Sequence, residues 1–245
     1  MKRTPMFAKE TDLCAAFIVA LPKGWTAYPE TAGWDILLSR DSDGIQIGVQ
    51  AKLKLNAEVI NQAIERHGAF AATHPGPDFR AVLVPADANR SLATIAEYAG
   101  LTVIRVSETQ GWPDGRKSRW FDPRLPDEKW SWGTRHWHHF CPTSRERLPD
   151  FIPDVVAGDK APLQLTEWKI KAIKIAVLLE TRGHVTRSDF KALDIDHRRW
   201  IAAKWIVPQN GVYIAGKAPD FRAQHPKNFE EIKAVIADWM PGAAA

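Results

Sequence analysis

The sequence contains little cysteine and no long apolar run, and each shortage excludes a class of protein. Its 245 residues include only two cysteines, Cys14 and Cys141, whose separation fits neither a disulfide framework nor a metal-ligand pattern. A reducing, cytoplasmic setting is the plain interpretation. No stretch approaches the roughly 18 apolar residues that a membrane-spanning helix needs, so we expect no membrane partner.

The N-terminus joins a basic start to an apolar stretch, as export signals do. Acidic and basic residues, Lys9, Glu10 and Asp12, stand directly before "LCAAFIVAL", however, and no small-residue cleavage site follows. We therefore expect a helix packed on a core at this position.

The formal net charge of +4 is small, but its distribution is uneven. Residues 1–106 contain 11 Lys/Arg and 11 Asp/Glu, whereas residues 160–205 contain 10 Lys/Arg and 5 Asp/Glu. This local basic excess favours a polyanion as the partner of the C-terminal part.

Hydrophobic periodicity predicts one α/β domain over residues 1–106. Apolar residues recur at helical or strand spacing in an order α-β-β-β-α-β-α-β, over residues 11–21, 25–28, 34–39, 45–53, 57–70, 79–85, 88–100 and 101–106. Strands separated by helices of this length favour a mixed sheet flanked by helices.

The chain changes character over residues 107–165, which hold seven prolines and five tryptophans. The prolines disfavour long regular elements and the tryptophans disfavour plain disorder, so we expect an irregular connector that packs against a neighbour. Residues 166–245 then predict helices over 166–183, 186–193 and 196–205, a hairpin turning at 209–211 and a last helix over 228–239. Three helices and a small hairpin give the outline of a winged helix-turn-helix.

A polar pair ends the apolar strand "IQIGVQAKL". Residues i and i+2 of a strand share a face, so we expect Gln50 and Lys52 to point the same way, with Asp35 of the neighbouring strand beside them. A carboxylate and a side-chain oxygen can hold Mg²⁺, and a lysine can orient an attacking water and offset charge on a phosphate. The alternative is that all three are ordinary polar residues of a strand.

"GWDILL" followed by "GVQAKL" resembles the PD-(D/E)xK nuclease superfamily, in the QxK variant of Mrr-type restriction endonucleases. The resemblance covers residues 9–106 and implies a restriction-endonuclease-like fold. It also implies that Asp35 is the principal metal ligand, Gln50 a weaker one, Lys52 the catalytic lysine, and Mg²⁺ or Mn²⁺ the cofactor. Glu30 or Glu10 would supply a further carboxylate, and we favour Glu30 because it is close to Asp35 in sequence.

Other polar residues are weaker candidates. Gln62 is a weak candidate for shaping the site, and a surface role is commoner. The segment "RHWHHFC" gathers His136, His138, His139 and Cys141, but their spacing fits no familiar closed zinc site, so incidental clustering is the better interpretation. Its tryptophans could stack on exposed bases, although packing between domains is the simpler role.

The C-terminal part carries the predicted DNA contacts. Recognition helices present their N-terminal residues to base edges, so the contact candidates are Arg187, His197, Arg198, Arg199 and Lys204. Trp200 and Trp205 are expected in the core.

Together these patterns predict a metal-dependent DNA endonuclease acting on double-stranded DNA, with a homodimer left open. The alternatives are a catalytically inactive DNA-binding protein and a protein-interaction adaptor that keep the nuclease scaffold.

Overall fold

The computed structural model describes residues 5–64, 75–110, 117–127, 136–159 and 163–240. The chain divides into two compact units. The first comprises Met1–Leu148 with Val156–Pro162, and the second comprises Pro149–Val155 with Leu163–Ala245. Among the described residues, no helix combines the length and the apolar character needed to cross a membrane.

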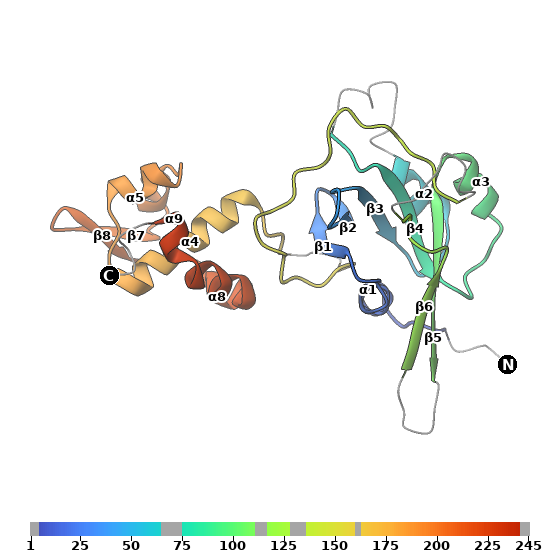
Figure 1. Cartoon of the computed structure of the whole chain (residues 1–245). Coiled ribbons are helices and arrows are strands. Elements are labelled where there is room, and N and C mark those ends of the chain that lie inside the picture. The colour runs from blue at the N-terminus through green and yellow to red at the C-terminus, as the bar shows by residue number, and fades with distance from the viewer. Residues whose placement is uncertain (1–4, 65–74, 111–116, 128–135, 160–162, 241–245) are drawn as a thin grey trace. The chain divides into compact units, whose positions relative to one another are not determined.

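A six-stranded mixed sheet forms the centre of the first unit (Figure 1). Its elements, in chain order, are α1 (Glu10–Val19), β1 (Trp25–Thr31), β2 (Trp34–Arg40), β3 (Gln46–Ala51), α2 (Ala57–Ile64), β4 (Phe79–Pro85), α3 (Ala93–Tyr98), β5 (Thr102–Gln110) and β6 (Lys117–Asp122). The strands lie in sequence order, with parallel pairing of β3 with β4 and of β4 with β5, and antiparallel pairing elsewhere. The predicted α/β class and the mixed, helix-flanked sheet are confirmed.

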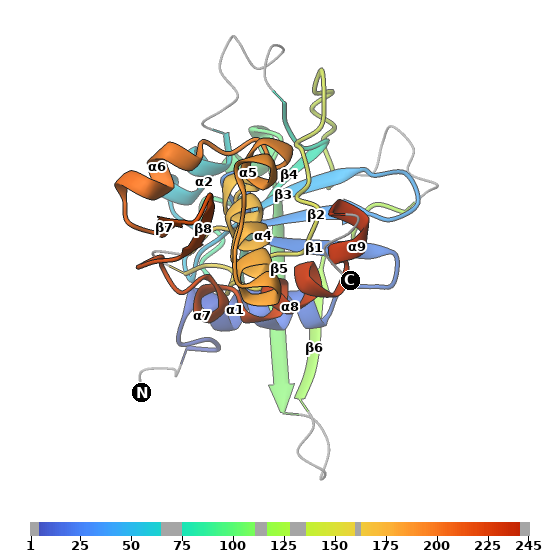
Figure 2. The ribbon, with the colours of Figure 1, turned by 90° about the vertical axis from the view of Figure 1, so that its left-hand side faces the viewer.

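Helices cover both faces of this sheet (Figures 1 and 2). On one face α1 buries Leu13 and Phe17 against Ile36 of β2 and Val49 of β3. On the other face α2 and α3 pack on a separate apolar cluster that includes Leu37. Apolar residues therefore alternate between two cores along β2, which explains why its sequence is almost continuously hydrophobic.

Two tight features set the geometry around β2. The β1–β2 hairpin turns at Ala32 and Gly33, which both have positive φ (54° and 80°), as a two-residue turn of the hairpin type requires. Gly48 on β3 lies under the Trp34 ring, and an added Cβ there would come within 2.4 Å of that ring. The indole can therefore lie flat on the sheet only because residue 48 is glycine.

The sheet extends beyond residue 106, since β5 continues to Gln110 and pairs with β6. Part of the segment set apart as a connector also packs on this unit. Arg145 donates to the buried carboxylate of Asp78 (2.8 Å), and the Gln46 side chain bonds the backbone of Glu146 in both directions (2.8 and 2.9 Å).

The second unit is mostly helical with one two-stranded hairpin. Its elements are α4 (Glu167–Arg182), α5 (Arg187–Ala192), α6 (His197–Ala202), β7 (Ile206–Gln209), β8 (Val212–Ala215), α7 (Phe221–Gln224), α8 (Pro226–Ala234) and α9 (Ile236–Trp239). Thr166 caps α4, and Gly183 ends it in the left-handed region, as predicted. The predicted last helix over 228–239 corresponds to two helices, α8 and α9, which are separated at Val235. Pro226 begins α8, a position where its missing N–H costs nothing.

Aromatic residues fill the core of this unit. Trp200 is 2% exposed and contacts Phe190 and Trp205 edge to face, with ring centroids 5.5 and 5.2 Å apart. Residues 149–155 join the same unit through Asp154, whose carboxylate bonds the fully buried His225 (2.9 Å) and the backbone N–H of Lys227 (2.8 Å).

Candidate active site

The candidate site lies where β2 begins and β3 ends. Pro29 pairs with Ile36 and Thr31 with Trp34, so Glu30 of β1 lies across from Asp35 between these two pairs. On the other side of β2, Ile36 pairs with Val49, the residue before Gln50 of β3. Lys52 follows one residue after β3 ends, and Glu10 is the first residue of α1. The start of α1, the end of β1, the start of β2 and the end of β3 therefore bring residues from four parts of the chain to one end of the sheet.

Asp35 is partly buried and held by the backbone of the next strand. Its Oδ2 accepts a hydrogen bond from the Ala51 N–H (2.7 Å), which fixes the carboxylate at the end of β3. Among the described residues, Oδ1 has no hydrogen-bond partner. Burial raises the pKa of Asp35 above its ordinary value and Glu10 adds to the rise, whereas the Ala51 N–H and the Lys52 ammonium oppose it. The charges of residues 10, 35 and 52 therefore act on one another.

Lys52 reaches the first turn of α1. Its Nζ lies 3.4 Å from Glu10 Oε2, and both side chains are largely shielded, with 27% and 30% of their surfaces exposed. A pair at this distance and exposure is weakly held. The ammonium can therefore exchange Glu10 for another anionic group nearby.

Glu30 adopts an unusual backbone conformation, with φ at 48° at the last residue but one of β1. Its Oε1 accepts a hydrogen bond from the Gly158 N–H (2.7 Å), a contact between positions far apart in sequence. Burial is the largest cause that raises the pKa of Glu30 to about 7, and the Asp35 carboxylate contributes, against the hydrogen bonds from Gly158 and Asp159. Near neutral pH this carboxyl is therefore about half protonated.

Cys14 completes the cluster and was not predicted to belong to it. It is fully buried on α1, four residues after Glu10 and thus on the same face of the helix. Burial raises the pKa of the Cys14 thiol far above its ordinary value, and the carboxylates of Asp35, Glu30 and Glu10 raise it further. Cys14 therefore remains a neutral thiol and is no nucleophile, and its helical spacing from Glu10 was the available sequence signal.

Gln50 makes a different contact from Lys52. Its Nε2 donates to the Gly33 carbonyl (2.9 Å), and no hydrogen bond joins it to Asp35 or Lys52 within the described ranges. The expectation that residues 50 and 52 share a face applies only inside a strand, and β3 ends at Ala51. Gln62 lies on α2, which covers the opposite face of the sheet from α1.

The donor groups at this end of the sheet are carboxylates. In the described part of the chain, no three His, Cys, Asp or Glu side chains are arranged to hold a metal. Mg²⁺ keeps most of its waters, however, and usually takes only one or two protein carboxylates. Asp35 and Glu30 face each other, carry oxygen donors, and have raised pKa values that a nearby cation would lower. The chemistry of this pair fits a hard divalent cation.

The His/Cys-rich segment serves packing instead. Trp137 is 7% exposed and contacts Phe79 edge to face, and its Nε1 donates to the Arg124 carbonyl (2.9 Å). His139 lies 3.4 Å from Asp78, and its Nδ1 accepts from the Cys141 N–H (3.0 Å). The backbone carbonyl of His136 accepts a hydrogen bond from the Thr102 hydroxyl, and the His138 ring contacts the Phe140 ring. Trp132 lies outside the described residues.

The predicted DNA contacts lie on and beside two short helices of the second unit. Asp196 caps α6 by accepting from the Arg198 N–H (3.0 Å), and the Arg198 side chain is 83% exposed. His197 is half-buried against Phe190 and Tyr213. The remaining candidates, Arg187, Arg199 and Lys204, are exposed. Trp200 is core, as predicted.

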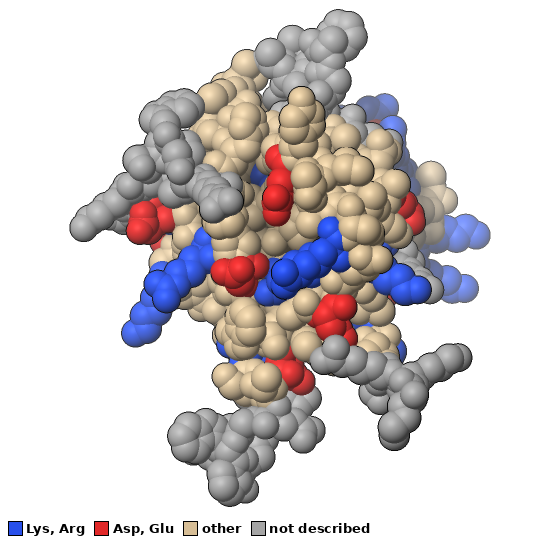
Figure 3. Space-filling view, turned by 90° about the vertical axis from the view of Figure 1, so that its right-hand side faces the viewer, with Lys and Arg blue, Asp and Glu red and all other residues tan. Residues whose placement is uncertain are grey.

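Charge on the first unit is mixed. Figure 3 shows one face of the molecule, on which Lys and Arg side chains alternate with Asp and Glu and neither sign forms a continuous patch. This agrees with the equal numbers of acidic and basic residues, 11 of each, in residues 1–106. The basic excess of the chain lies instead in residues 160–205.

Comparison with protein-family models, with curated proteins and with solved structures gave no match to this chain. Its function therefore has to be argued from the cluster itself.

Proposed function

We propose that the chain is a metal-dependent DNA endonuclease that hydrolyses phosphodiester bonds. In this proposal the first unit is a PD-(D/E)xK-type nuclease domain, and the second is a winged helix-turn-helix that holds duplex DNA. The observation that carries the proposal is the convergence of Asp35, Glu30, Glu10 and Lys52 at one end of the sheet. Perturbed carboxyl pKa values beside a lysine are typical of catalytic sites.

Asp35 and Glu30 would hold the divalent cation, Mg²⁺ or Mn²⁺. When bound, such an ion would polarise the phosphoryl group and lower the pKa of a coordinated water. Asp35 is suited to this role because one oxygen is fixed by the Ala51 N–H while the other has no partner among the described residues. Gln50, the ligand that the resemblance implies, has its amide nitrogen on the Gly33 carbonyl, so we assign it at most a weak contribution through Oε1.

Lys52 would act on the phosphate and the attacking water. Its ammonium would orient the water and offset charge that develops on the transferring phosphoryl group. The 3.4 Å contact with Glu10 holds the ammonium beside Asp35 before DNA binds, and a phosphate oxygen can then compete for it. We therefore assign Glu10 a positioning role.

The second unit would supply most of the affinity for DNA. Its order of three helices followed by a hairpin supports the winged helix-turn-helix, with α6 as the recognition helix. Arg187, Arg198, Arg199 and Lys204 are exposed on or next to α5 and α6, where their charges can meet phosphates or base edges.

The test is cleavage of supercoiled plasmid by the full chain with Mg²⁺ or Mn²⁺. Lys52→Ala should slow cleavage by about 10²- to 10³-fold, and Asp35→Asn should slow it at least as much. The matched controls are Lys54→Ala and Asp87→Asn, because both residues are exposed and make no side-chain contact in the described part of the chain. Cleavage that persists undiminished in Lys52→Ala or Asp35→Asn would exclude this site.

A DNA-binding protein without catalysis is the second candidate. The neutral Gln50 and the absence of a three-ligand group among the described residues favour it. This candidate predicts steeply salt-dependent DNA binding with no cutting by either divalent ion, and a gel-shift titration at two salt concentrations detects it. A protein-interaction adaptor would show neither binding nor cutting.

A further inference from the structure

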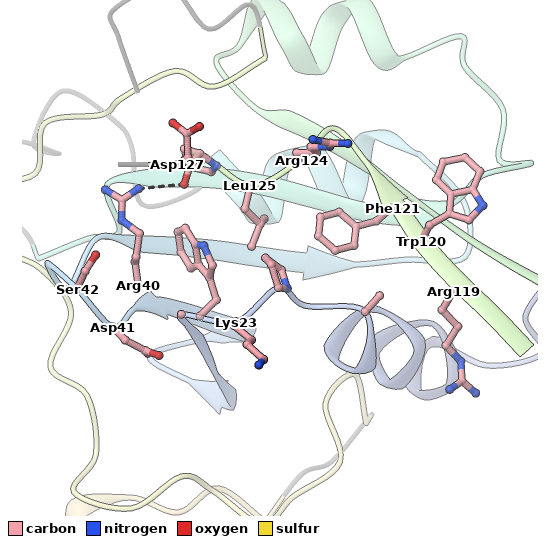
Figure 4. A pocket seen from close by; sticks show the side chains of 15 residues that line it. Lys23, Arg40, Asp41, Ser42, Arg119, Trp120, Phe121, Arg124, Leu125 and Asp127 are labelled. Carbon is pink, nitrogen blue, oxygen red and sulfur yellow. Dashed lines mark hydrogen bonds between the residues drawn. The ribbon is translucent and has the colours of Figure 1, made fainter. Parts of the chain in front are cut away.

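A cavity lies at the opposite end of β2 from the candidate site. It has a volume of about 920 Å³ and is lined by the end of α1, the start of β1, the β2–β3 turn, β6 and the segment that follows β6 (Figure 4). Asp35 and Arg40 are five residues apart on this strand, which corresponds to about 17 Å. The cavity is therefore separate from the carboxylate cluster.

The floor of the cavity is apolar and partly aromatic. Pro22, Trp25, Phe121 and Leu125 line it. Phe121 is fixed edge to face on Phe17 of α1, with ring centroids 4.9 Å apart. The Trp25 ring has the Arg40 guanidinium over it, 5.7 Å from the ring centroid. Aromatic surface held in place by such neighbours can stack with a flat ring where it remains open to the cavity.

Positive charge dominates the remaining wall, which contains four cationic side chains and two aspartates. Arg40 is held in place by Asp43 (2.6 Å) and by the Pro126 carbonyl (2.9 Å), and Arg119 is paired with Glu108 (2.8 Å).

The other two cations differ from these. Among the described residues, the side chains of Lys23 and Arg124 have no ion-pair or hydrogen-bond partner, and both are exposed. Figure 4 shows Leu125 and Phe121 in the space between Arg124 on one side and Lys23 on the other. Two exposed cations, neither paired within the described ranges, thus flank an apolar floor on both sides.

We infer that this cavity binds an unpaired nucleotide of a single DNA strand, with its base on the Trp25 and Phe121 floor and its flanking phosphates at Lys23 and Arg124. Aromatic floors and flanking cations are the combination by which proteins hold single strands. A duplex cannot fill the cavity in this way, because its bases are stacked on one another. The inference goes beyond the proposed function, since it concerns binding at a different place and needs no catalysis.

The test measures binding of a fluorescent oligothymidylate to the full chain by anisotropy, in EDTA so that no cleavage occurs. Lys23→Ala with Arg124→Ala should lower the slope of log affinity against log salt by about 1.4, at about 0.7 per cation. Trp25→Ala should weaken binding by at least about fivefold, and Trp25→Phe should retain most of the affinity. Affinity for a duplex of the same length should be unchanged in all of them.

Two further variants keep the test independent of folding. Ser42→Glu adds a negative charge at an exposed position of the lining and should weaken single-strand binding. Lys54→Ala, an exposed lysine outside the lining, should have no effect. Because every measurement is made in EDTA, a negative result here is distinguishable from failure of the nuclease proposal, which is tested by cleavage.

Several results would overturn the inference. If Ser42→Glu and the double variant bind the single strand as tightly as the control Lys54→Ala does, the cavity is excluded as the binding site. Displacement by polyglutamate as effective as by oligothymidylate would indicate a general polyanion site. A mononucleotide that binds as tightly as the oligonucleotide would indicate a nucleotide pocket, and equal losses for duplex and single strand would exclude an unpaired base.

Discussion

The carboxyl group of Glu30 makes the stability of the first unit depend on pH in an unusual direction. Most carboxylates stabilise a fold more strongly as they ionise, because they have partners in the native state. Glu30 is partly buried, faces Asp35, and has no cationic partner among the described residues. Replacing it with glutamine keeps an oxygen that can accept from the Gly158 N–H and removes only the ability to ionise.

The direction of the effect follows from the two pKa values. The pKa of Glu30 rises from 4.5 to about 7 on folding, so the native state binds more protons than the unfolded state between these values. Stability contributed by this group is therefore full below about pH 4.5 and is lost as the pH rises through about 7. A full shift of this size corresponds to about 3 kcal/mol. Because Glu30 is partly exposed to solvent, screening reduces the expected difference to about 1–2 kcal/mol.

Hydrogen exchange of the slowest β2 amides reports the stability of the first unit separately from the second. We expect the free energy of unfolding of the first unit to be about 1–2 kcal/mol higher in Glu30→Gln than in the wild type near pH 8, and equal in the two proteins near pH 4. Glu58→Gln, at an exposed position of α2, should show no such difference. Carboxyl NMR should show Glu30 titrating near 7 in EDTA and at lower pH with Mg²⁺, since a cation favours the ionised form. A midpoint near 4.5 in EDTA, or equal stability changes at both pH values, would refute this account of the cluster.

Three other variants test the packing and the DNA contacts. Gly48→Ala should destabilise the first unit by about 1–3 kcal/mol in hydrogen exchange, because the new Cβ would lie 2.4 Å from the Trp34 ring. Asp154→Ala should lower the free energy of unfolding of the second unit by about 3 kcal/mol in urea titrations, because His225 and two backbone N–H groups lose their acceptor. Arg199→Ala should reduce the slope of log affinity against log salt for duplex binding by about 0.9 if Arg199 contacts a phosphate. An unchanged slope would exclude Arg199 from the DNA interface.

The elements around the candidate site could be predicted because local patterns decide them. β2 and β3 are apolar runs joined by a short polar turn, which predicts their antiparallel pairing, and this pairing places Asp35 beside the end of β3. The helical spacing of Leu13 and Phe17 likewise predicts α1. Local order of this kind also sufficed for α4, α5, α6 and the β7–β8 hairpin of the second unit, but not for the break between α8 and α9.

Features that depend on distant pairing could not be predicted. β6 has a weak pattern in a proline-rich stretch, and it forms because β5 offers an edge with which it pairs. The contact of Gly158 with Glu30, and that of Asp154 with His225, join positions 128 and 71 residues apart through polar atoms that leave no periodic signal. The partner of Lys52 is likewise set by where α1 docks on the sheet.

Three unfavourable features coincide at Glu30 and Asp35, on the two sides of the β1–β2 turn. Glu30 holds a left-handed backbone conformation in a strand, which costs on the order of 1 kcal/mol. Its carboxyl faces the like charge of Asp35, and both groups lose solvation. The bonds from backbone N–H groups to Glu30 and Asp35 offset only part of this repulsion, and Lys52 is shared with Glu10. A divalent cation between the two carboxyl groups would remove the electrostatic part of this cost, and the metal-assisted phosphodiester hydrolysis proposed for this site would use a cation in such a position.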